Sequence, residues 1–471
     1  MDVVQTDLSI KAMRKKILIL SWPAIIRLFL QSLVGTVDVI MVGKLTGPAI
    51  GAVGVSNRIV FIIIGAFTAL SVGSTALVAH YIGAKDIKKG NEILWQSILI
   101  SLIMGIGITV VGFLFSESLL KGMLSLMDDK EGYDFIIREG VVYIKIVLTS
   151  MIFGFPMMII NAVFQGVGDM KTPLYLMIIT NIVNVIFNYL LIFGHWIFPE
   201  MGVAGAALGT AISRMVGCLI GVGILIIGKS NLKLTFKYLS FKLDTVIIKA
   251  IFKIGIPSSV EQFARQGSQI IITIFVAGLG AHALDANEIV MNINNLAIMP
   301  GFGFGVAALT LVGQSLGAGD SDLANRYAKQ TALIGIVLML PITISMFIFA
   351  EPLVMLFDTS KTVVPLAVTV VRIIIITQPI LTLILILAGA LRGAGDTMWV
   401  MISTIIGNWG ARVVLGILFG YYLGIGLTGF YLAIGIDIIV RALLMLYRFK
   451  SGKWKNIKVL SKKDKLKEVI N

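Results

Sequence analysis

The sequence predicts an all-α polytopic membrane protein, with twelve transmembrane helices in two six-helix lobes related by a pseudo-two-fold axis along the membrane normal. Three observations predict this fold: the composition, the recurrence of long apolar runs and an internal repeat. Of the 471 residues, 57% are hydrophobic and only 14% are charged, and the mean hydropathy is +0.97. A soluble protein of this length needs many more polar residues to cover its surface.

Apolar runs long enough to cross a bilayer, about 20 residues each, recur along nearly the whole chain. Twelve spans are predicted, at 15–42, 50–80, 91–115, 134–164, 172–194, 202–228, 249–279, 285–316, 326–350, 362–391, 397–420 and 425–449. Lys and Arg gather in alternate loops, whereas the loop at 116–134 is acidic. By the positive-inside rule, both termini are expected to face the cytoplasm of a multi-pass protein in the cell membrane.

The net charge of +14 does not indicate a nucleic-acid partner, because the basic residues lie in short loops and in the tail rather than on one solvated face. The single Cys218 cannot form an internal disulfide, and three scattered His do not make a metal site. We therefore expect no cofactor and no redox or metal chemistry.

Four short motifs of the first half return in the same order in the second half. Gln-Gly-Val-Gly-Asp at 165–169 returns as Arg-Gly-Ala-Gly-Asp at 392–396, and Gly-Ala-Lys-Asp at 83–86 as Gly-Ala-Gly-Asp at 317–320. The spacing is roughly 225–235 residues, which indicates a duplicated unit. Six spans separate the copies, so both have the same orientation. The predicted domains are an N-lobe at 1–228, a cytoplasmic linker at 229–248, a C-lobe at 249–449 and a basic cytoplasmic tail at 450–471.

The repeated Gly-Asp motifs are best explained as turns, in which Gly ends one helix in the left-handed conformation and Asp caps the next. A gating role is the alternative. The Gly-x-Gly-Asp pair also resembles the motifs of intramembrane aspartyl proteases, which need two carboxylates facing each other. Asp169 and Asp396 are expected at cytoplasmic turns instead, so no catalytic residue is assigned and the protein is not expected to be an enzyme.

The strongest candidate for function is Asp38, a carboxylate amid apolar residues in the outer half of the first span. Such a group is expected to take and release a proton near neutral pH. Asn184 and Asn188 share one face of the fifth span, and Asn161 lies in the fourth. Buried Asn either contributes carbonyl oxygens to a cation or holds helices together. With Asp38 these residues form the predicted ion-coupling site for H⁺ or Na⁺, and Na⁺ would contact Asp38, Asn184 and Asn188.

The second half does not copy this cluster. Asn408 is the repeat equivalent of Asn184, but Arg412 stands where Asn188 would be, so one ion site in the N-lobe is expected. In the seventh span, Glu261 either pairs with Arg265 one turn later or meets Arg27, its repeat equivalent, in a cytoplasmic gate. The candidate gate or substrate contacts are Arg27, Glu261, Arg265, Gln378 and Asn408.

The segments Val37–Gly43, Gln165–Pro173 and Leu190–Gly194, together with the repeated Gly-x-Gly-Asp, resemble the multidrug and toxic compound extrusion (MATE) family over essentially the whole chain. The resemblance implies a secondary active antiporter that exports amphipathic, cationic organic compounds in exchange for H⁺ or Na⁺. It places the helix-bending proline at Pro23, the family's acid at Asp38 and its polar cluster at Asn161, Asn184 and Asn188. The expected partners are small organic substrates and membrane lipids, and the expected state is a monomer.

Two features leave alternatives open. Some members of the family carry Asp at the position of Asn188, so the choice between H⁺ and Na⁺ stays open. The main rival is a flippase for lipid-linked precursors or polysaccharides from the related superfamily, which has extra helices and a cationic cavity. The flippase alternative stays open because five arginines lie within predicted spans and could line such a cavity: Arg27, Arg58, Arg265, Arg372 and Arg412.

Overall fold

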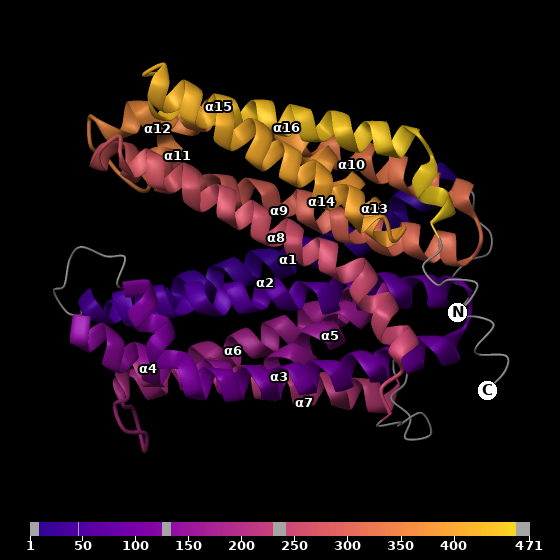
Figure 1. Cartoon of the computed structure of the whole chain (residues 1–471), viewed down its shortest axis with the longest axis horizontal. Coiled ribbons are helices and arrows are strands. Elements are labelled where there is room, and N and C mark those ends of the chain that lie inside the picture. The colour runs from indigo at the N-terminus through magenta and orange to yellow at the C-terminus, as the bar shows by residue number, and fades with distance from the viewer. Residues whose placement is uncertain (1–8, 46, 125–132, 229–241, 458–471) are drawn as a thin grey trace. The chain divides into compact units, whose positions relative to one another are not determined.

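A computed structural model describes residues 9–45, 47–124, 133–228 and 242–457 of the chain (Figure 1). The regular structure of these residues is entirely helical. Helices suit a bilayer because each one satisfies its backbone hydrogen bonds internally. The greater part of the predicted linker, residues 229–241, and most of the predicted tail, residues 458–471, lie outside the described residues.

The helices alternate with short turns along both halves. The first half contains α1 (Ile10–Gly43), α2 (Gly47–Gly83), α3 (Ile87–Leu124), α4 (Tyr133–Thr149), α5 (Met151–Val167), α6 (Lys171–Phe193) and α7 (Gly202–Ile227). The second half contains α8 (Thr245–Ala277), α9 (Ala281–Gly317), α10 (Ser321–Ile348), α11 (Ala350–Met355), α12 (Val363–Ile376), α13 (Gln378–Gly393), α14 (Thr397–Ile405), η2 (Ile406–Val413), α15 (Val414–Ile417), η3 (Leu418–Tyr422), α16 (Leu427–Lys450) and η4 (Lys453–Asn456). The segments η2 and η3 are π-helical, and η4 is a 3₁₀-helix.

The predicted twelve-helix layout is confirmed. Within the described residues, nine helices are long and apolar enough to cross a membrane, the run from α14 to η3 counting as one. The pairs α4–α5 and α12–α13 are each one span, bent by 47° and 46° at a short break. The remaining span, the seventh in chain order, is α8. It has 33 residues and carries the charged residues Lys249, Lys253, Glu261 and Arg265.

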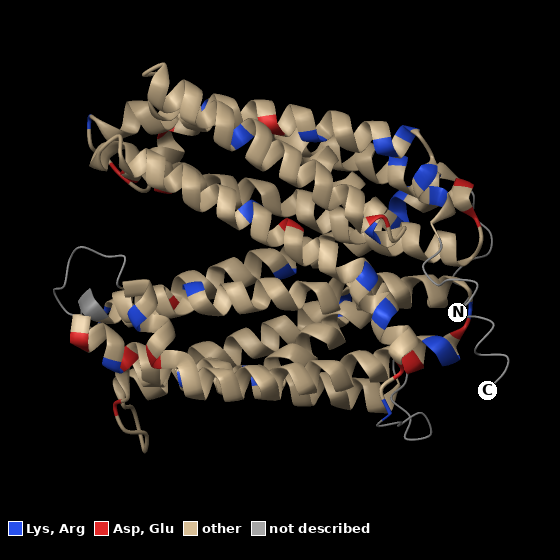
Figure 2. Cartoon of the chain, viewed as in Figure 1, with Lys and Arg blue, Asp and Glu red and all other residues tan. Residues whose placement is uncertain are grey.

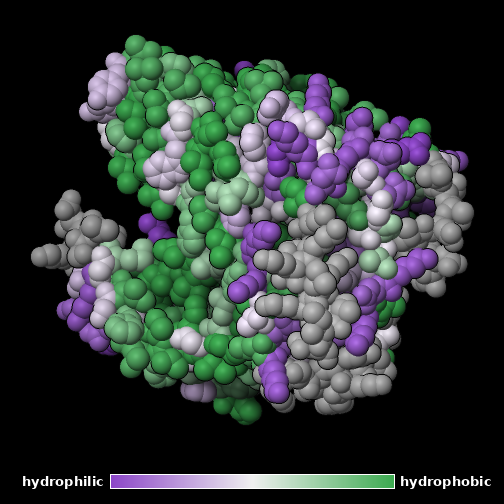
Figure 3. All heavy atoms as spheres, turned by 45° about the vertical axis from the view of Figure 1, so that its right-hand side comes forward, coloured by the Kyte–Doolittle hydropathy of each residue, from purple (hydrophilic) through white to green (hydrophobic). Residues whose placement is uncertain are grey.

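The surface of the described residues is that of a membrane protein. Large apolar side chains are exposed along the helices, for example Phe113 at 57% and Ile274 at 64%. Figure 3 shows hydrophobic residues over much of one face, and hydrophilic ones gathered in patches. In the C-terminal half, Lys and Arg concentrate where α13 ends and α16 runs into η4 (Figure 2). An exposed apolar surface of this extent is stable when lipid covers it.

The described chain divides into two compact units. One consists of residues 26–78 and 86–252, and the other of residues 1–25, 79–85 and 253–471; we call them the N-unit and the C-unit. They follow the duplicated halves with three exceptions. The beginning of α1 and the end of α2 group with the C-unit, and the beginning of α8, up to Phe252, groups with the N-unit. The division within α1 falls after Ile25, two residues beyond Pro23, the predicted hinge.

The repeated glycines mark close approaches between helix backbones inside the C-unit. A Cβ on Gly83, at the end of α2, would overlap the backbone carbonyl of Gln314 in α9. A Cβ on Gly317, at the end of α9, would overlap the carbonyl of His80 in α2. Gln314 lies three residues before Gly317, and His80 lies three residues before Gly83. The two glycines, which are repeat equivalents, therefore make equivalent contacts with each other's helix. The duplication seen in the sequence is therefore repeated in the packing.

Replacing Gly317 by Ala should destabilise the protein, because a methyl group cannot enter this contact without separating α2 from α9. Overpacking of this kind costs about 1–3 kcal/mol. The measurement is the melting temperature of the purified protein in detergent. Gly107→Ala is the matched control, because it is also a helical glycine but has open space around its Cβ position. Equal melting temperatures for the two variants would contradict the contact.

The predicted turn, a left-handed Gly followed by a capping Asp, is complete at 165–169 and 317–320. At 83–86 the Asp caps the next helix, but the left-handed residue is Lys85, with a φ of 59°. The Oδ1 atoms of Asp86, Asp169 and Asp320 accept the backbone N–H of Lys89, Thr172 and Leu323, at 3.0, 3.0 and 2.8 Å, and so cap the following helices. Gly168, Gly319 and Gly395 have positive φ angles of 91°, 79° and 83°. At 392–396 the carboxylate of Asp396 binds Nε of Arg448 at 2.6 Å and makes no capping bond.

Candidate functional site

The N-unit brings Asp38 and two of the predicted asparagines into direct contact. The Nδ2 of Asn188 donates to Oδ1 of Asp38 at 2.7 Å and to Oδ1 of Asn184 at 3.3 Å. The two asparagines are one turn apart on α6, so both face the same neighbour. Asp38 lies on α1, five residues before its end at Gly43. We call Asp38, Asn184 and Asn188 the carboxylate–amide cluster.

A glycine of α7 leaves room for this cluster. A Cβ on Gly209 would overlap Oδ1 of Asn188, so the backbone of α7 passes directly beside that carboxamide. Asn184 in turn donates to Oγ1 of Thr210 at 3.4 Å. The Oδ1 of Asn188 is buried and accepts no hydrogen bond from any described residue. A carboxylate and a carbonyl oxygen that is not engaged are the ligand types that hard cations prefer.

The other predicted amide, Asn161 on α5, is not joined to the cluster by a hydrogen bond. Its Oδ1 is buried and has no partner among the described residues. Asn181 does not join the cluster either, since its Nδ2 donates to the backbone carbonyl of Leu30 at 3.3 Å. Asn161 therefore keeps a carbonyl oxygen that could accept a hydrogen bond or contact a cation. Asn181 instead connects α6 to α1.

A half-buried cation that interacts with Asp38 is missing from the sequence-based candidates. Arg214, on α7, interacts electrostatically with Asp38. Its Nη1 donates to Oγ of Ser150 at 2.7 Å and to the carbonyl of Val147 at 3.4 Å, which holds it at the bend between α4 and α5. Opposite charges attract strongly where water is scarce. The signal was present in the sequence, because Arg214 is the lone charged residue of the apolar run at 202–228.

Glu261 forms its ion pair with Arg392, so the pairing of Glu261 with Arg265 one turn later was wrong. The Nη2 of Arg392 donates to both carboxylate oxygens of Glu261, at 2.7 and 2.8 Å. Arg265 instead donates to Oε1 of Gln262. Arg392 begins the second copy of the Gly-x-Gly-Asp motif, at 392–396, so this ion pair connects the motif to α8. The gate between Glu261 and Arg27 would join the two units and stays a prediction.

Breaking the Glu261–Arg392 pair should destabilise the C-unit, because the side chains are only 7% and 21% exposed. Glu261→Gln should cost roughly 1.5–3 kcal/mol, the value typical of hydrogen bonds to charged groups. A double-mutant cycle with Arg392→Gln, measured by thermal denaturation, should give a non-additive coupling of at least ~0.5 kcal/mol. Arg265→Gln should show no comparable coupling with Glu261→Gln. Strict additivity for both pairs would show that neither arginine stabilises Glu261.

The two remaining C-unit candidates are buried amides. Gln378, at the start of α13, donates from Nε2 to Oδ1 of Asn294 at 2.7 Å, and its Oε1 has no partner among the described residues. Asn408, in the π-helical η2, is fully buried, and neither polar atom of its side chain has a partner in the described chain. Buried polar atoms without partners are costly, and a functional role or a bound water or ion is among the explanations for them.

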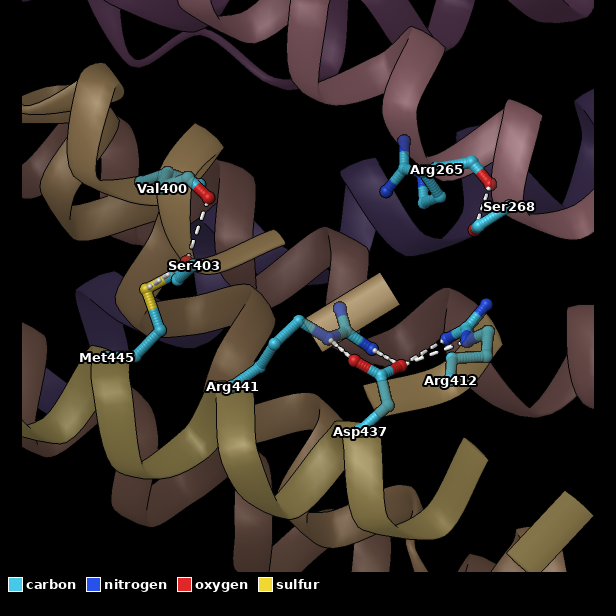
Figure 4. A network of polar contacts seen from close by, with 8 residues as sticks. All are labelled: Arg265, Ser268, Val400, Ser403, Arg412, Asp437, Arg441 and Met445. Carbon is cyan, nitrogen blue, oxygen red and sulfur yellow. Dashed lines mark hydrogen bonds and ion pairs between the residues drawn. The ribbon is translucent and has the colours of Figure 1, made fainter. Parts of the chain in front are cut away.

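The C-unit also contains an ionic group that the sequence interpretation missed. Asp437 on α16 is fully buried and binds Arg412 from η2 and Arg441 one turn along α16 (Figure 4). Only Arg412 was singled out from the sequence. Asp437 and Arg441 are four residues apart within the apolar run 425–449, a spacing that indicates an ion pair on one helix face.

The described residues contain no group of three or more His, Cys, Asp or Glu side chains that could hold a metal ion. The carboxylate–amide cluster has one carboxylate and otherwise amide oxygens. Its chemistry suits a proton or a monovalent cation that crosses the membrane, rather than a tightly held divalent metal.

Comparison with known proteins gives consistent results. The MatE family model matches residues 23–190 and 257–418, so its two segments begin at the repeat-equivalent Pro23 and Pro257. A probable multidrug resistance protein NorM of Thermotoga maritima is 31% identical over 464 residues, which cover 97% of this chain and 96% of the relative. The uncharacterized transporter YisQ of Bacillus subtilis is 29% identical over 435 residues, 92% of this chain and 94% of the relative.

Solved structures show the same fold. A MOP superfamily transporter from Pyrococcus furiosus superimposes with a TM-score of 0.85 at 22% identity, covering 96% of this chain and 100% of that chain. An outward-facing multidrug resistance MATE family transporter gives a TM-score of 0.84, also at 22% identity, over 96% of this chain and 100% of that chain.

Proposed function

Because the chain belongs to the MatE family, whose model matches most of its length, we propose that it is a secondary active antiporter that exports amphipathic organic compounds in exchange for H⁺ or Na⁺. The observation that carries the proposal is the contact of Asp38 with Asn188 within a membrane-spanning unit. A carboxylate at such a position is costly, and ion coupling is a function that justifies its cost. A cationic substrate would likewise suit a carboxylate site, by charge complementarity.

A transport assay tests this proposal. The protein is reconstituted into liposomes, and uptake of a panel of amphipathic fluorescent dyes is recorded under an imposed pH or Na⁺ gradient. The dye should accumulate against its own gradient only while the ion gradient lasts, and an ionophore that collapses the gradient should stop it. Equal dye movement with and without an ion gradient would refute secondary antiport.

We expect the residue at position 188 to influence which ion drives transport. Asn188→Asp removes the Nδ2 donor to Asp38 and places two carboxylates together. Two neighbouring carboxylates repel each other, and a bound Na⁺ relieves this repulsion. We expect transport by the variant to become about tenfold faster with Na⁺ than without it, a difference of ~1.4 kcal/mol.

Asn181→Asp is the matched control for this variant, because it adds a carboxylate to the same helix outside the cluster. Its Na⁺ dependence should equal that of the native protein. If Asn188→Asp transports equally well in Na⁺-free and Na⁺-containing buffer, the cluster does not select the ion.

The proposal includes a location and a topology. The protein would lie in the cell membrane with both termini in the cytoplasm, because the basic stretches occupy alternate loops. It would act as a monomer and would use the ion gradient in place of a cofactor. It would carry out no enzymatic reaction: Asp169 caps α6 and Asp396 binds Arg448, so each Asp of the two Gly-x-Gly-Asp motifs has a local structural role.

One observation favours a second function, the flippase for lipid-linked precursors. Arg412 and Arg441 lie deep in the C-unit beside the half-buried Arg265, and arginines inside a membrane attract phosphates. Protection of a fluorescent lipid-linked pyrophosphate from an external reagent, in the same liposomes, distinguishes the two. The antiporter should transport the dyes and leave this lipid unmoved.

A further inference from the structure

The ionic group of the C-unit contains more positive than negative charge. Asp437 accepts from Nε and Nη2 of Arg412 at 3.0 and 2.6 Å, and from Nε and Nη2 of Arg441 at 2.7 and 3.0 Å. One carboxylate thus serves two guanidinium groups, whose side chains are 11% and 8% exposed. One positive charge in this buried group is therefore not neutralised by Asp437.

A third guanidinium, that of Arg265, belongs to the same region. Figure 4 shows it near Arg412 and Arg441, with no bond to either or to Asp437. Its charge interacts unfavourably with those of Arg392, Arg412 and Arg441 and favourably with that of Glu261. Glu261, however, is already bound to Arg392. The only acceptor of the Arg265 side chain among the described residues is the neutral Gln262.

The group lies far from the ends of its helices. Arg412, Asp437 and Arg441 lie on the last two spans. Arg441 is the nearest of them to the end of its span, nine residues before Lys450, which is roughly 13 Å along an α-helix. Excess charge at this depth is expensive, and a buried charge that no counter-ion compensates destabilises a fold strongly. A structural ion pair for Asp437 needs one arginine. Two arginines on one acid, with the half-buried Arg265 in the same region, are therefore an arrangement that gains stability when an anion enters.

The unused donors suit a carboxylate. Nη1 of Arg265, Arg412 and Arg441 has no hydrogen-bond acceptor in the described part of the chain. A guanidinium presents its N–H groups in a plane, which matches the two oxygens of a carboxylate. The buried carboxamide of Asn408, without partners, follows Gly407, whose Cβ position overlaps Asp437 and Arg441. Arg412 and Asn408 also share the π-helical η2, and π-helical turns are frequent at functional sites.

We propose that Arg265, Arg412 and Arg441 form a binding site for the carboxylate group of an amphipathic organic anion or zwitterion carried by this transporter. A monoanion fits the charge count, because Asp437 leaves one buried positive charge and Arg265 is only half-buried. The proposal rests on the transport function proposed above and extends its substrates beyond cations.

Binding to the full-length protein in detergent tests the proposal without any ion gradient. The probes are naphthalene-2-carboxylate, its neutral carboxamide and naphthyl phosphate, titrated by calorimetry. The carboxylate should bind roughly tenfold or more tightly than the amide, as expected for charge-assisted hydrogen bonds. Equal affinities of carboxylate and amide would overturn the site. Binding of the phosphate without binding of the carboxylate would overturn the assigned class.

The test variant is Arg265→Gln, because this arginine has no ion pair whose loss would unfold the protein. It should lose most of the preference for the carboxylate over the amide, and Arg265→Lys should lose part of it, since the ammonium lacks the planar fork. Arg372→Gln is the matched control, an intramembrane arginine of the same unit that contacts the ring of Phe347. Unchanged melting temperatures show that the variants are folded. If Arg265→Gln retains the full preference, the site is wrong.

A last variant separates this inference from the proposed antiport. Asp38→Asn lies in the N-unit and should bind the carboxylate with the affinity of the native protein. Loss of gradient-driven transport with retained binding would concern the antiport alone. Gradient-driven dye transport by a protein that does not discriminate carboxylate from amide would overturn only the anion site.

Discussion

Replacing Asp38 by Asn is expected to abolish gradient-driven efflux while the protein remains folded and inserted in the membrane. The carboxamide has nearly the shape of the carboxylate, so the contact with Asn188 can persist. It can neither take up a proton nor attract a cation by its charge. Initial rates of dye transport under imposed pH and Na⁺ gradients measure the effect, which should be at least about a hundredfold, or ~2.7 kcal/mol.

Asp134→Asn is the control for this variant. Asp134 lies in the first turn of α4 in the same unit and is exposed, so its loss should leave transport unchanged. Expression and melting temperature should match the native protein in both variants. Full transport by Asp38→Asn would show that coupling resides elsewhere.

Replacing Asp437 by Asn should cause the largest loss of stability. Asp437 is the only acid bound to Arg412 and Arg441 in the described chain, and its side chain is fully buried. Removing one partner of a buried ion pair leaves an uncompensated charge, at a cost of about 3–5 kcal/mol. We expect a strongly lowered melting temperature and reduced yield from the membrane.

A compensating variant shows that charge is the cause of this loss. Replacing Asp437, Arg412 and Arg441 together by Leu or Met of similar volume should recover much of the stability, as apolar replacements of buried ionic groups often do. A melting temperature that is unchanged by Asp437→Asn would mean that the two arginines do not depend on this carboxylate.

Much of the fold could be predicted because it depends on patterns that extend over long stretches of the sequence, namely apolar runs and repeated motifs. The apolar runs gave the twelve spans, and the repeated motifs gave the duplication that recurs in the contacts of Gly83 and Gly317. The bends within the fourth and tenth spans were not predicted. Each joins two helical segments across one residue, Ser150 or Thr377, which hydropathy does not distinguish from a continuous helix.

The candidate site was predicted in part, for a clear physical reason. Asn184 and Asn188 share a face by helical periodicity, and Asp38 stands out as a charge in an apolar run. Which arginine meets which acid depends on packing between helices distant in sequence. Glu261 finds Arg392, 131 residues away, in preference to a neighbour one turn along. Arg214 could have been found as a lone intramembrane charge, but its proximity to Asp38 is a property of the folded unit.

The most direct test of antiport is to run the exchange backwards. Liposomes containing the protein and a trapped pH-sensitive or Na⁺-sensitive dye receive a gradient of a fluorescent amphipathic cation, with no ion gradient imposed. We predict that movement of this substrate drives H⁺ or Na⁺ in the opposite direction, in proportion to substrate flux, and that Asp38→Asn abolishes both movements. Substrate flux without any counterflow of ions would contradict the exchange mechanism.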